Sequence, residues 1–193
     1  MRWVAASILL FIAVYTVVTL RYRKPGRPFE PARDLTERAA AERLRGLGYQ
    51  RLPVDFEQPA VPLTAAQLRG AGSAAGRGLP AAFAGALGTG PALPAAVTQL
   101  LAAGDAPAGS RYRLQFTCTQ PDFKTQVGGA LLYRRDRELF LLPVCERIPG
   151  RLLARSQDAT VLATFSVQSL PPGRYALSIL GRSASQHCTF TVK

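Results

Sequence analysis

The sequence predicts a mainly β protein, in which one transmembrane helix and a flexible region with short helices precede a small antiparallel β-sandwich. Two observations predict this class. An uncharged apolar run near the N-terminus is long enough to cross a bilayer, and apolar and polar side chains alternate repeatedly from residue 110 onward. The length of 193 residues suits one compact domain with attachments. The 48% of hydrophobic residues argues against a wholly disordered chain.

Residues 3–20 read WVAASILLFIAVYTVVTL and carry no charge. As a helix this run spans roughly 27 Å, close to the ~30 Å hydrocarbon core of a bilayer. A single segment in lipid must be helical, because a lone strand leaves its backbone unpaired. We therefore predict an anchor over residues 1–22. The residues expected at the membrane interface are Trp3, Arg21, Tyr22, Arg23 and Lys24.

A cleaved signal peptide is the alternative to an anchor. Signal peptides usually have an apolar region of about 7–15 residues that ends in a small-x-small cleavage site. Here the run is longer, and it ends Val-Val-Thr-Leu directly before Arg21. These features favour an uncleaved single-pass signal anchor in the cell (inner) membrane.

The orientation of the anchor stays open between two sides. More basic residues follow the apolar run than precede it, which by the positive-inside rule favours a cytoplasmic C-terminal part. Large domains can translocate despite flanking charge, and a short basic N-terminus also suits a signal anchor. By analogy with small sandwiches outside the cytoplasm, we expect the C-terminal domain on the exported, periplasmic side.

Residues 23–33 are rich in proline and basic residues. Closely spaced prolines block a helix and favour extended chain, which predicts a stiff spacer that is also compatible with anionic lipid. Residues 34–48 follow as a short amphipathic helix near 35–46. Asp34 and Glu37 match a capping box at its start, and Gly46 or Gly48 can end it.

Residues 49–109 are dominated by Ala, Gly and Pro and contain few aromatic residues. Short helices could begin near Thr64, Pro80 and Pro94. Each would bury little surface, so we expect a mobile linker with marginal helices rather than a second domain.

The last part of the chain, residues 110–193, changes to a period of two. Tyr112, Leu114, Phe116 and Cys118 share one parity, for example, and polar residues occupy the other. Six or seven half-buried antiparallel strands in this length suit a small two-sheet sandwich. The expected strands are 111–119, 128–134, 138–144, 159–167, 173–180 and 187–193, with 151–155 as a short edge strand.

The segment Leu170-Pro-Pro-Gly-Arg-Tyr-Ala-Leu-Ser-Ile ends the pattern. It resembles the penultimate strand of bacterial immunoglobulin-like or fibronectin-type-III-like modules. The resemblance covers only about the last 25 residues of the chain. It implies a sandwich fold and carries no active site.

Cys118 and Cys188 both point inward by parity, on the first and last predicted strands. Those strands are often neighbours in such sandwiches, so an exported domain could form a disulfide between them. Two buried thiols are the equal alternative. Cys145 is the expected free thiol, and the spacing of the three cysteines matches no zinc pattern.

The sequence offers little for catalysis. His187 and Cys188 are adjacent, and adjacent residues of a strand face opposite sides. The chain has no G-x-S-x-G, H-E-x-x-H or P-loop motif, and its acidic residues are scattered singly. We expect no enzyme, no cofactor and no metal. A hydrolase would need Ser, Asp or Glu side chains that converge only in the fold.

The net charge of +12 comes almost entirely from arginine, which a GC-rich genome would also produce. We expect a non-catalytic, membrane-anchored protein that presents its sandwich to protein or envelope components. The expected partners are the bilayer and a protein, without nucleic acid or a small-molecule ligand. The alternative is a cytoplasmic-facing protein whose basic surface binds anionic lipid or nucleic acid. The candidate binding surface is Arg111, Arg113, Arg134, Arg135, Arg137 and Arg174.

Overall fold

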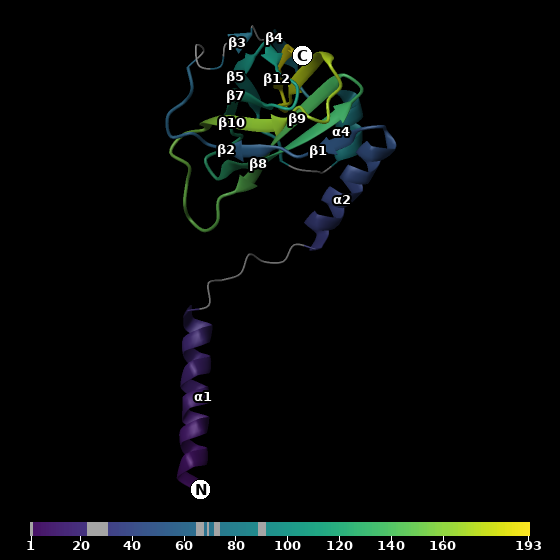
Figure 1. The fold of residues 1–193 in the computed structure, drawn as a ribbon. Coiled ribbons are helices and arrows are strands. Elements are labelled where there is room, and N and C mark those ends of the chain that lie inside the picture. Colours follow the sequence, from purple (N-terminus) through teal and green to yellow (C-terminus); the bar gives the residue numbers. More distant parts are fainter. Residues whose placement is uncertain (1, 23–30, 65–67, 69, 72–73, 89–91) are drawn as a thin grey trace. The chain divides into compact units, whose positions relative to one another are not determined.

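The computed structural model describes residues 2–22, 31–64, 68, 70–71, 74–88 and 92–193 (Figure 1). It divides into two units, residues 1–35 and 36–193. The interface residues Arg23 and Lys24 and most of the predicted spacer lie outside the described residues. Residues 31–33 of the predicted spacer belong to a helix.

The first unit contains helix α1 (Arg2–Tyr22), in which the predicted apolar run lies. By length and composition this helix can cross a membrane, and none of its described side chains is buried by the protein. Its one hydroxyl in the first turns, on Ser7, donates a hydrogen bond of 3.0 Å to the backbone oxygen of Trp3. A hydroxyl satisfied within its own helix needs no partner from the surroundings.

Helix α2 (Pro31–Gly46) corresponds to the helix predicted near residues 35–46. It begins about one turn earlier, at a proline, because the first turn of a helix needs no amide donor. Its end is the predicted glycine stop. Gly48 has a φ of +85°, and the amides of Gly48 and Tyr49 donate to the carbonyls of Arg45 and Leu44. These two bonds form a Schellman motif, which turns the chain into the first strand.

In the described part of the chain, twelve strands form one continuous, curled sheet. The strands are β1 (Gln50–Leu52), β2 (Asp55–Glu57), β3 (Gly70–Ala71), β4 (Ala74–Arg77), β5 (Ala96–Ala103), β6 (Asp105–Ala106), β7 (Arg111–Thr119), β8 (Thr125–Arg135), β9 (Glu138–Arg147), β10 (Asp158–Ser166), β11 (Gly173–Ile179) and β12 (Ala184–Val192). Along the sheet they follow the order β1-β8-β9-β11-β12-β5-β7-β10-β2, while β3 pairs with β5, and β4 and β6 pair with β12.

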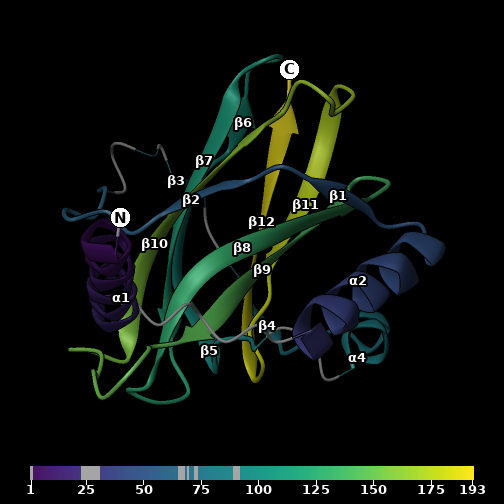
Figure 2. The ribbon, with the colours of Figure 1, turned by 90° about the horizontal axis from the view of Figure 1, so that it is seen from below.

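The two ends of this order are consecutive in the chain. Strand β1 pairs with β8 and strand β2 pairs with β10, and only Pro53 and Val54 separate β1 from β2. Residues 50–57, the closing segment, therefore bridge both ends of the sheet and make it a barrel. Figure 2 shows the segment as one ribbon that crosses from β8 to β10. Leu52, Val54 and Phe56 pack against the barrel core.

Strands β1 to β6 contain a little under half of the described residues of 49–109, a segment in which we expected a linker with marginal helices. Strand β5 lies between β12 and β7, and its residues replace the helix predicted from Pro94. Pairing on both sides overrides the weak strand preference of alanine. Helix α4 (Ala81–Leu87) does follow Pro80, as predicted.

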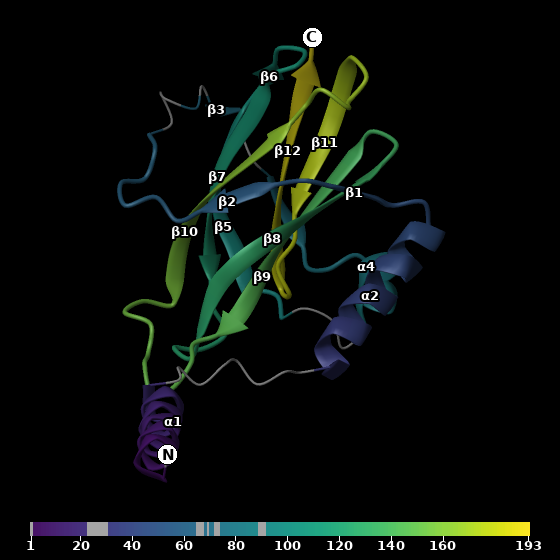
Figure 3. The same ribbon diagram turned by 60° about the horizontal axis from the view of Figure 1, so that its bottom comes forward.

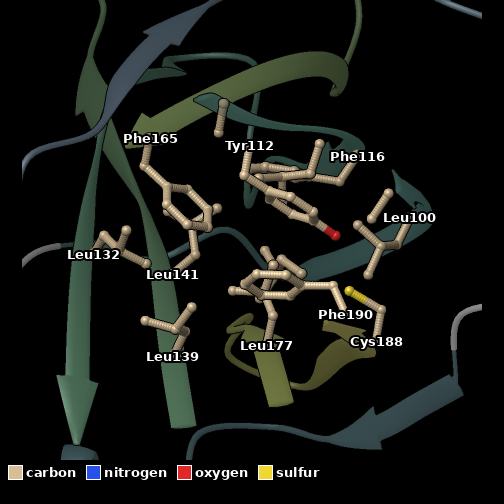
Figure 4. Close-up of a cluster of buried hydrophobic side chains, with 14 of the residues drawn as sticks. Leu100, Tyr112, Phe116, Leu132, Leu139, Leu141, Phe165, Leu177, Cys188 and Phe190 are labelled. Atoms are coloured by element: carbon tan, nitrogen blue, oxygen red, sulfur yellow. The ribbon is translucent and has the colours of Figure 1, made fainter. Parts of the chain in front are cut away.

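The barrel interior holds the larger of two apolar clusters (Figure 4). Tyr112 stacks on Phe190 with ring centroids 4.2 Å apart, and Phe165 packs against Tyr112 at 5.3 Å. The second cluster lies outside strands β8 and β9, beneath α2 and α4. Strand β9 is therefore buried on both faces, which explains why its run of Leu139 to Val144 does not alternate.

The strand pattern of residues 110–193 is confirmed as mainly β, with changes in the architecture. Strands β8 and β9 form the predicted hairpin around Asp136 and Arg137. Residues 151–155 form no strand. Because β9 runs parallel to β11 and β12 parallel to β5, the sheet is mixed rather than antiparallel. A division into two sheets of immunoglobulin type is not shown.

Phe56→Ala should lower the stability of the barrel, because it removes the largest apolar side chain of the closing segment. Phe56 is half-buried, so we expect a loss of about 2 kcal/mol, below the range for a fully buried Phe. Urea unfolding of residues 36–193 measures the loss, since this fragment contains both apolar clusters. Exposed Arg51→Ala is the control. Equal stability of the two variants would contradict a closing role.

Candidate interaction surface

The predicted arginine surface falls into two groups, one on each side of the turn between β10 and β11. The first group surrounds the β8–β9 hairpin. Arg134 donates to the carbonyl oxygens of Asp136 at 3.1 Å and Ser169 at 3.0 Å. The guanidinium carbon of Arg135 lies 4.9 Å from the ring centroid of Tyr49. Its Nη2 atom lies 3.8 Å from Oε2 of Glu138. The hairpin arginines are thus oriented by local contacts rather than free in solvent.

Arg137 and Arg174 extend the first group onto β11. The guanidinium of Arg137 lies over Gly173, where a Cβ atom would meet it at 2.6 Å. Gly173 also has a φ of +141°, a conformation that residues with a side chain rarely adopt. The close approach of Arg137 and this backbone conformation therefore both require glycine at position 173. Arg174 donates to the hydroxyl of Thr189 at 3.3 Å, and it forms no ion pair with the described residues.

The second group is Arg111 and Arg113 on β7. Arg111 forms an ion pair with Asp55 of the closing segment. The two arginines border a surface hollow of about 370 Å³. Its lining is Asp55, Phe56, Glu57, Arg111, Arg113, Leu162 and Thr164. The hollow therefore combines both signs of charge with an apolar floor.

Both groups lie at one end of the barrel. Arg134 bonds to Ser169, and the amide of Val167 donates to the carbonyl of Ser110, so the β10–β11 turn links the hairpin to the start of β7. We call the six arginines together the arginine-rich end. It also contains four acidic residues, so its charge is mixed. These are Asp55, Glu57, Asp136 and Glu138.

All three cysteines are buried and free. The strand order gives a physical reason why Cys118 and Cys188 form no disulfide here. Strand β5 lies between β7 and β12, and Cys118 pairs across to Val97 of β5 rather than to β12. Two strand spacings are about 9.6 Å, beyond the Cα separation of a disulfide.

Burial makes the three thiols poor nucleophiles. It raises the pKa of Cys145 from 9.0 to about 11, while nearby Arg182 lowers that pKa and Asp122 raises it. Burial also raises the pKa of Cys188 to about 11, against a hydrogen bond from Tyr112 that lowers it. The pKa of Cys118 is raised by burial and by the charge of Cys145. At neutral pH the reactive thiolate is therefore scarce.

One polar pair was missed by sequence reasoning. Ser178 and His187 face each other across β11 and β12, with Ser178 Oγ 2.7 Å from His187 Nδ1. The pair is half-buried, because Gly76 of β4 lies against His187 Nε2. A separation of nine positions in the sequence gave no signal, since only the strand register brings the two side chains together.

A serine within hydrogen-bonding distance of an imidazole is one part of a hydrolytic site. Such a site also needs an open reaction face and a group that orients the base. Here the backbone of β4 covers the Nε2 side of the ring. Within the described ranges, no group of three or more His, Cys, Asp or Glu side chains could hold a metal ion.

Comparison of the chain with protein-family models, curated protein sequences and solved structures finds no match.

Gly76→Ala should break the Ser178–His187 hydrogen bond, because the new Cβ would overlap the imidazole and displace it. We expect a loss of about 1–3 kcal/mol, typical of overpacking. His187 is the only histidine, so its imidazole NMR signals report the change directly. Gly129→Ala is the matched strand control, because it has nothing within 4 Å. Adding His187→Ala to Gly76→Ala should recover most of the loss; no recovery would contradict the steric explanation.

Stability should fall as pH rises from about 9 towards 11. In the unfolded chain the thiols lose their protons near 9.0, whereas the folded Cys145 and Cys188 hold theirs to about 11. The folded state then binds more protons in this window, so raising the pH favours unfolding. Urea midpoints across the window measure the slope. The slope should be smaller in Cys145→Ala, and an unchanged slope would show that this thiol does not contribute.

Proposed function

We propose that this chain is a single-pass, membrane-anchored, non-catalytic protein that presents its barrel to a protein or envelope partner. The observation that carries the proposal is α1, a helix long and apolar enough to cross a bilayer and separate from the compact unit 36–193. A helix with an apolar surface all round and no protein covering it needs lipid or another apolar environment.

Features at the ends of α1 support an anchor over a cleaved leader. Arg2 and Trp3 lie at one end, and Arg21 and Tyr22 lie at the other. Aromatic and basic side chains at both ends suit the two headgroup layers of a bilayer. We place the protein in the cell (inner) membrane, with the barrel on the exported side, and the cytoplasmic-facing orientation is the alternative.

The arginine-rich end is the surface proposed for a protein partner. Its six arginines are interspersed with four acidic residues and border a hollow floored by Phe56 and Leu162. A surface with both charges and exposed apolar atoms suits a protein, since protein interfaces combine an apolar centre with a polar rim. A nucleic acid would need a more uniformly positive stripe. Nucleic-acid binding is therefore the weaker alternative, and strong salt-dependent retention on DNA would favour it.

The non-catalytic part of the proposal is supported by the reactive groups themselves. The thiols are held protonated by burial, and the Ser178–His187 pair is covered on the Nε2 side by Gly76. In this proposal the barrel presents a binding surface to a partner, as immunoglobulin-like and fibronectin-type-III-like modules do. The comparison is one of role and not of fold.

Ile12→Arg should release the protein from membranes, because a charge at the centre of a spanning helix costs about 2.5–3.5 kcal/mol on insertion scales. Carbonate extraction of membranes from expressing cells measures the release. Ile12→Leu is the matched control and should stay in the pellet. Intact mass separates the anchor from a leader, because an uncleaved chain keeps its 20.7 kDa. A wild-type chain that is cleaved, or that washes off with carbonate, would contradict the proposal.

A C-terminal reporter fusion determines the side on which the barrel lies. Reporter activity that requires export is expected, and activity confined to the cytoplasm would support the alternative orientation.

A further inference from the structure

The end of the barrel opposite the arginine-rich end has a different surface. There the turn between β7 and β8 meets the longer turn between β9 and β10. Three large apolar side chains are exposed in these turns, Phe123 at 46%, Leu152 at 70% and Leu153 at 62%. Leu152 and Leu153 leave most of their surface exposed, and neither belongs to the two apolar clusters of the folded unit. Clustered exposed apolar side chains mark interaction sites.

The two turns are held together by backbone hydrogen bonds. The amide of Ile148 donates to the carbonyl of Lys124, and the amide of Ala154 donates to the carbonyl of Phe123, both at 2.8 Å. These bonds bracket Leu152 and Leu153 and hold them beside Phe123. The apolar side chains are therefore presented together by an ordered backbone.

The same turn is basic. From Arg147 to Arg155 the chain contains three arginines and no acidic residue, and all three arginine side chains are exposed. We call Phe123, Arg147, Arg151, Leu152, Leu153 and Arg155 the apolar-basic patch. Its pattern of leucine and phenylalanine beside arginine is that of segments that lie in the interface of an anionic bilayer. A nucleic acid would use the arginines and leave the leucines without a role.

The patch lies on the side of the barrel that also carries one end of α2. Figures 1 and 3 show that the end of α2 nearer Thr36 and the β9–β10 turn lie on the same side of the barrel. Only residues 23–30 separate α1 from α2, and such a segment spans at most roughly 30 Å. The short covalent link therefore keeps the barrel within reach of the membrane that holds α1.

We propose that the apolar-basic patch docks the barrel onto the anionic phospholipid surface of the membrane in which α1 is anchored. The leucines enter the headgroup region, and the arginines contact lipid phosphates. The orientation that this gives rests on the proposed anchor, whereas the affinity of the patch for lipid does not. Docking leaves the arginine-rich end facing away from the bilayer, where a protein partner can reach it.

The fragment 36–193 tests the patch without α1, so a failure of the anchor and a failure of the patch are distinguishable. The only tryptophan of the chain is Trp3, which lies outside this fragment. Leu153→Trp therefore introduces a single fluorescent reporter at the patch, and Leu47→Trp introduces one at an exposed site at the end of α2. With vesicles of phosphatidylcholine and phosphatidylglycerol that contain brominated lipid, Leu153→Trp should be quenched and Leu47→Trp should not. Absence of quenching at position 153, or equal quenching at both positions, would overturn the proposal.

A charge-matched pair of variants separates the patch from the general basicity of the fragment. Arg151→Glu with Arg155→Glu should weaken flotation with these vesicles by at least about tenfold. Arg113→Glu with Arg174→Glu makes the same change of charge at the other end and should retain most of the binding. Equal losses would show general attraction and overturn the patch. Binding to a DNA duplex that depends on Arg151 and Arg155, without vesicle binding, would assign the patch to nucleic acid instead.

Discussion

Closure of the curled sheet by residues 50–57 is the constraint on which the rest of the structure depends. Without the closing segment, β8 and β10 would each expose an unpaired edge, and the aromatic core around Tyr112 and Phe190 would open to water. The three residues of β1 pair with β8, and the three residues of β2 pair with β10. A break of two residues separates β1 from β2. Pro53 fits this break, because a proline has no amide to donate and ends the pairing of β1 before the chain reaches β10. A second link strengthens the closure, since the side chain of Gln58 donates to the carbonyl of Val127 on β8 at 3.0 Å.

Closure also places the charged surface. The closing segment brings Asp55 and Glu57 beside the arginines of β7, and its start at Tyr49 gives Arg135 an aromatic ring to stack on. The arginine-rich end is therefore a product of the same segment that holds the barrel shut. The apolar-basic patch has a different origin, because it comes from two turns whose large apolar side chains are exposed. A barrel has two ends, and in this chain each end has a surface with its own chemistry.

The sequence predicted the parts of the fold in which local pattern and burial agree. Strands β7, β10, β11 and β12 alternate and were expected close to their observed bounds, and the β8–β9 hairpin was expected from its turn. Strand β5 was missed because its alanines and its Leu100–Leu101 pair suit a helix as well as a strand, and only the neighbours β7 and β12 decide between them. The closing segment was missed because three-residue strands carry too little pattern to be distinguished from a loop. The arginines were identified individually, but their mixed-charge setting required the topology, as did the contact between Ser178 and His187 across two strands.

Anchoring changes what affinity a docking surface needs. A domain tethered by a short linker experiences an effective concentration of its target in the millimolar range, so a contact with a dissociation constant of about that size is already half occupied. Three arginines and three apolar side chains at the apolar-basic patch would give only weak binding in solution, and that is sufficient beside a membrane. Because the contact is weak, it can orient the barrel without fixing it, and a partner that engages the arginine-rich end does not have to compete with the lipid. The anchor and the two ends of the barrel would then have complementary roles. Helix α1 limits the distance of the barrel from the membrane, the patch determines the orientation of the barrel on it, and the arginine-rich end binds the partner.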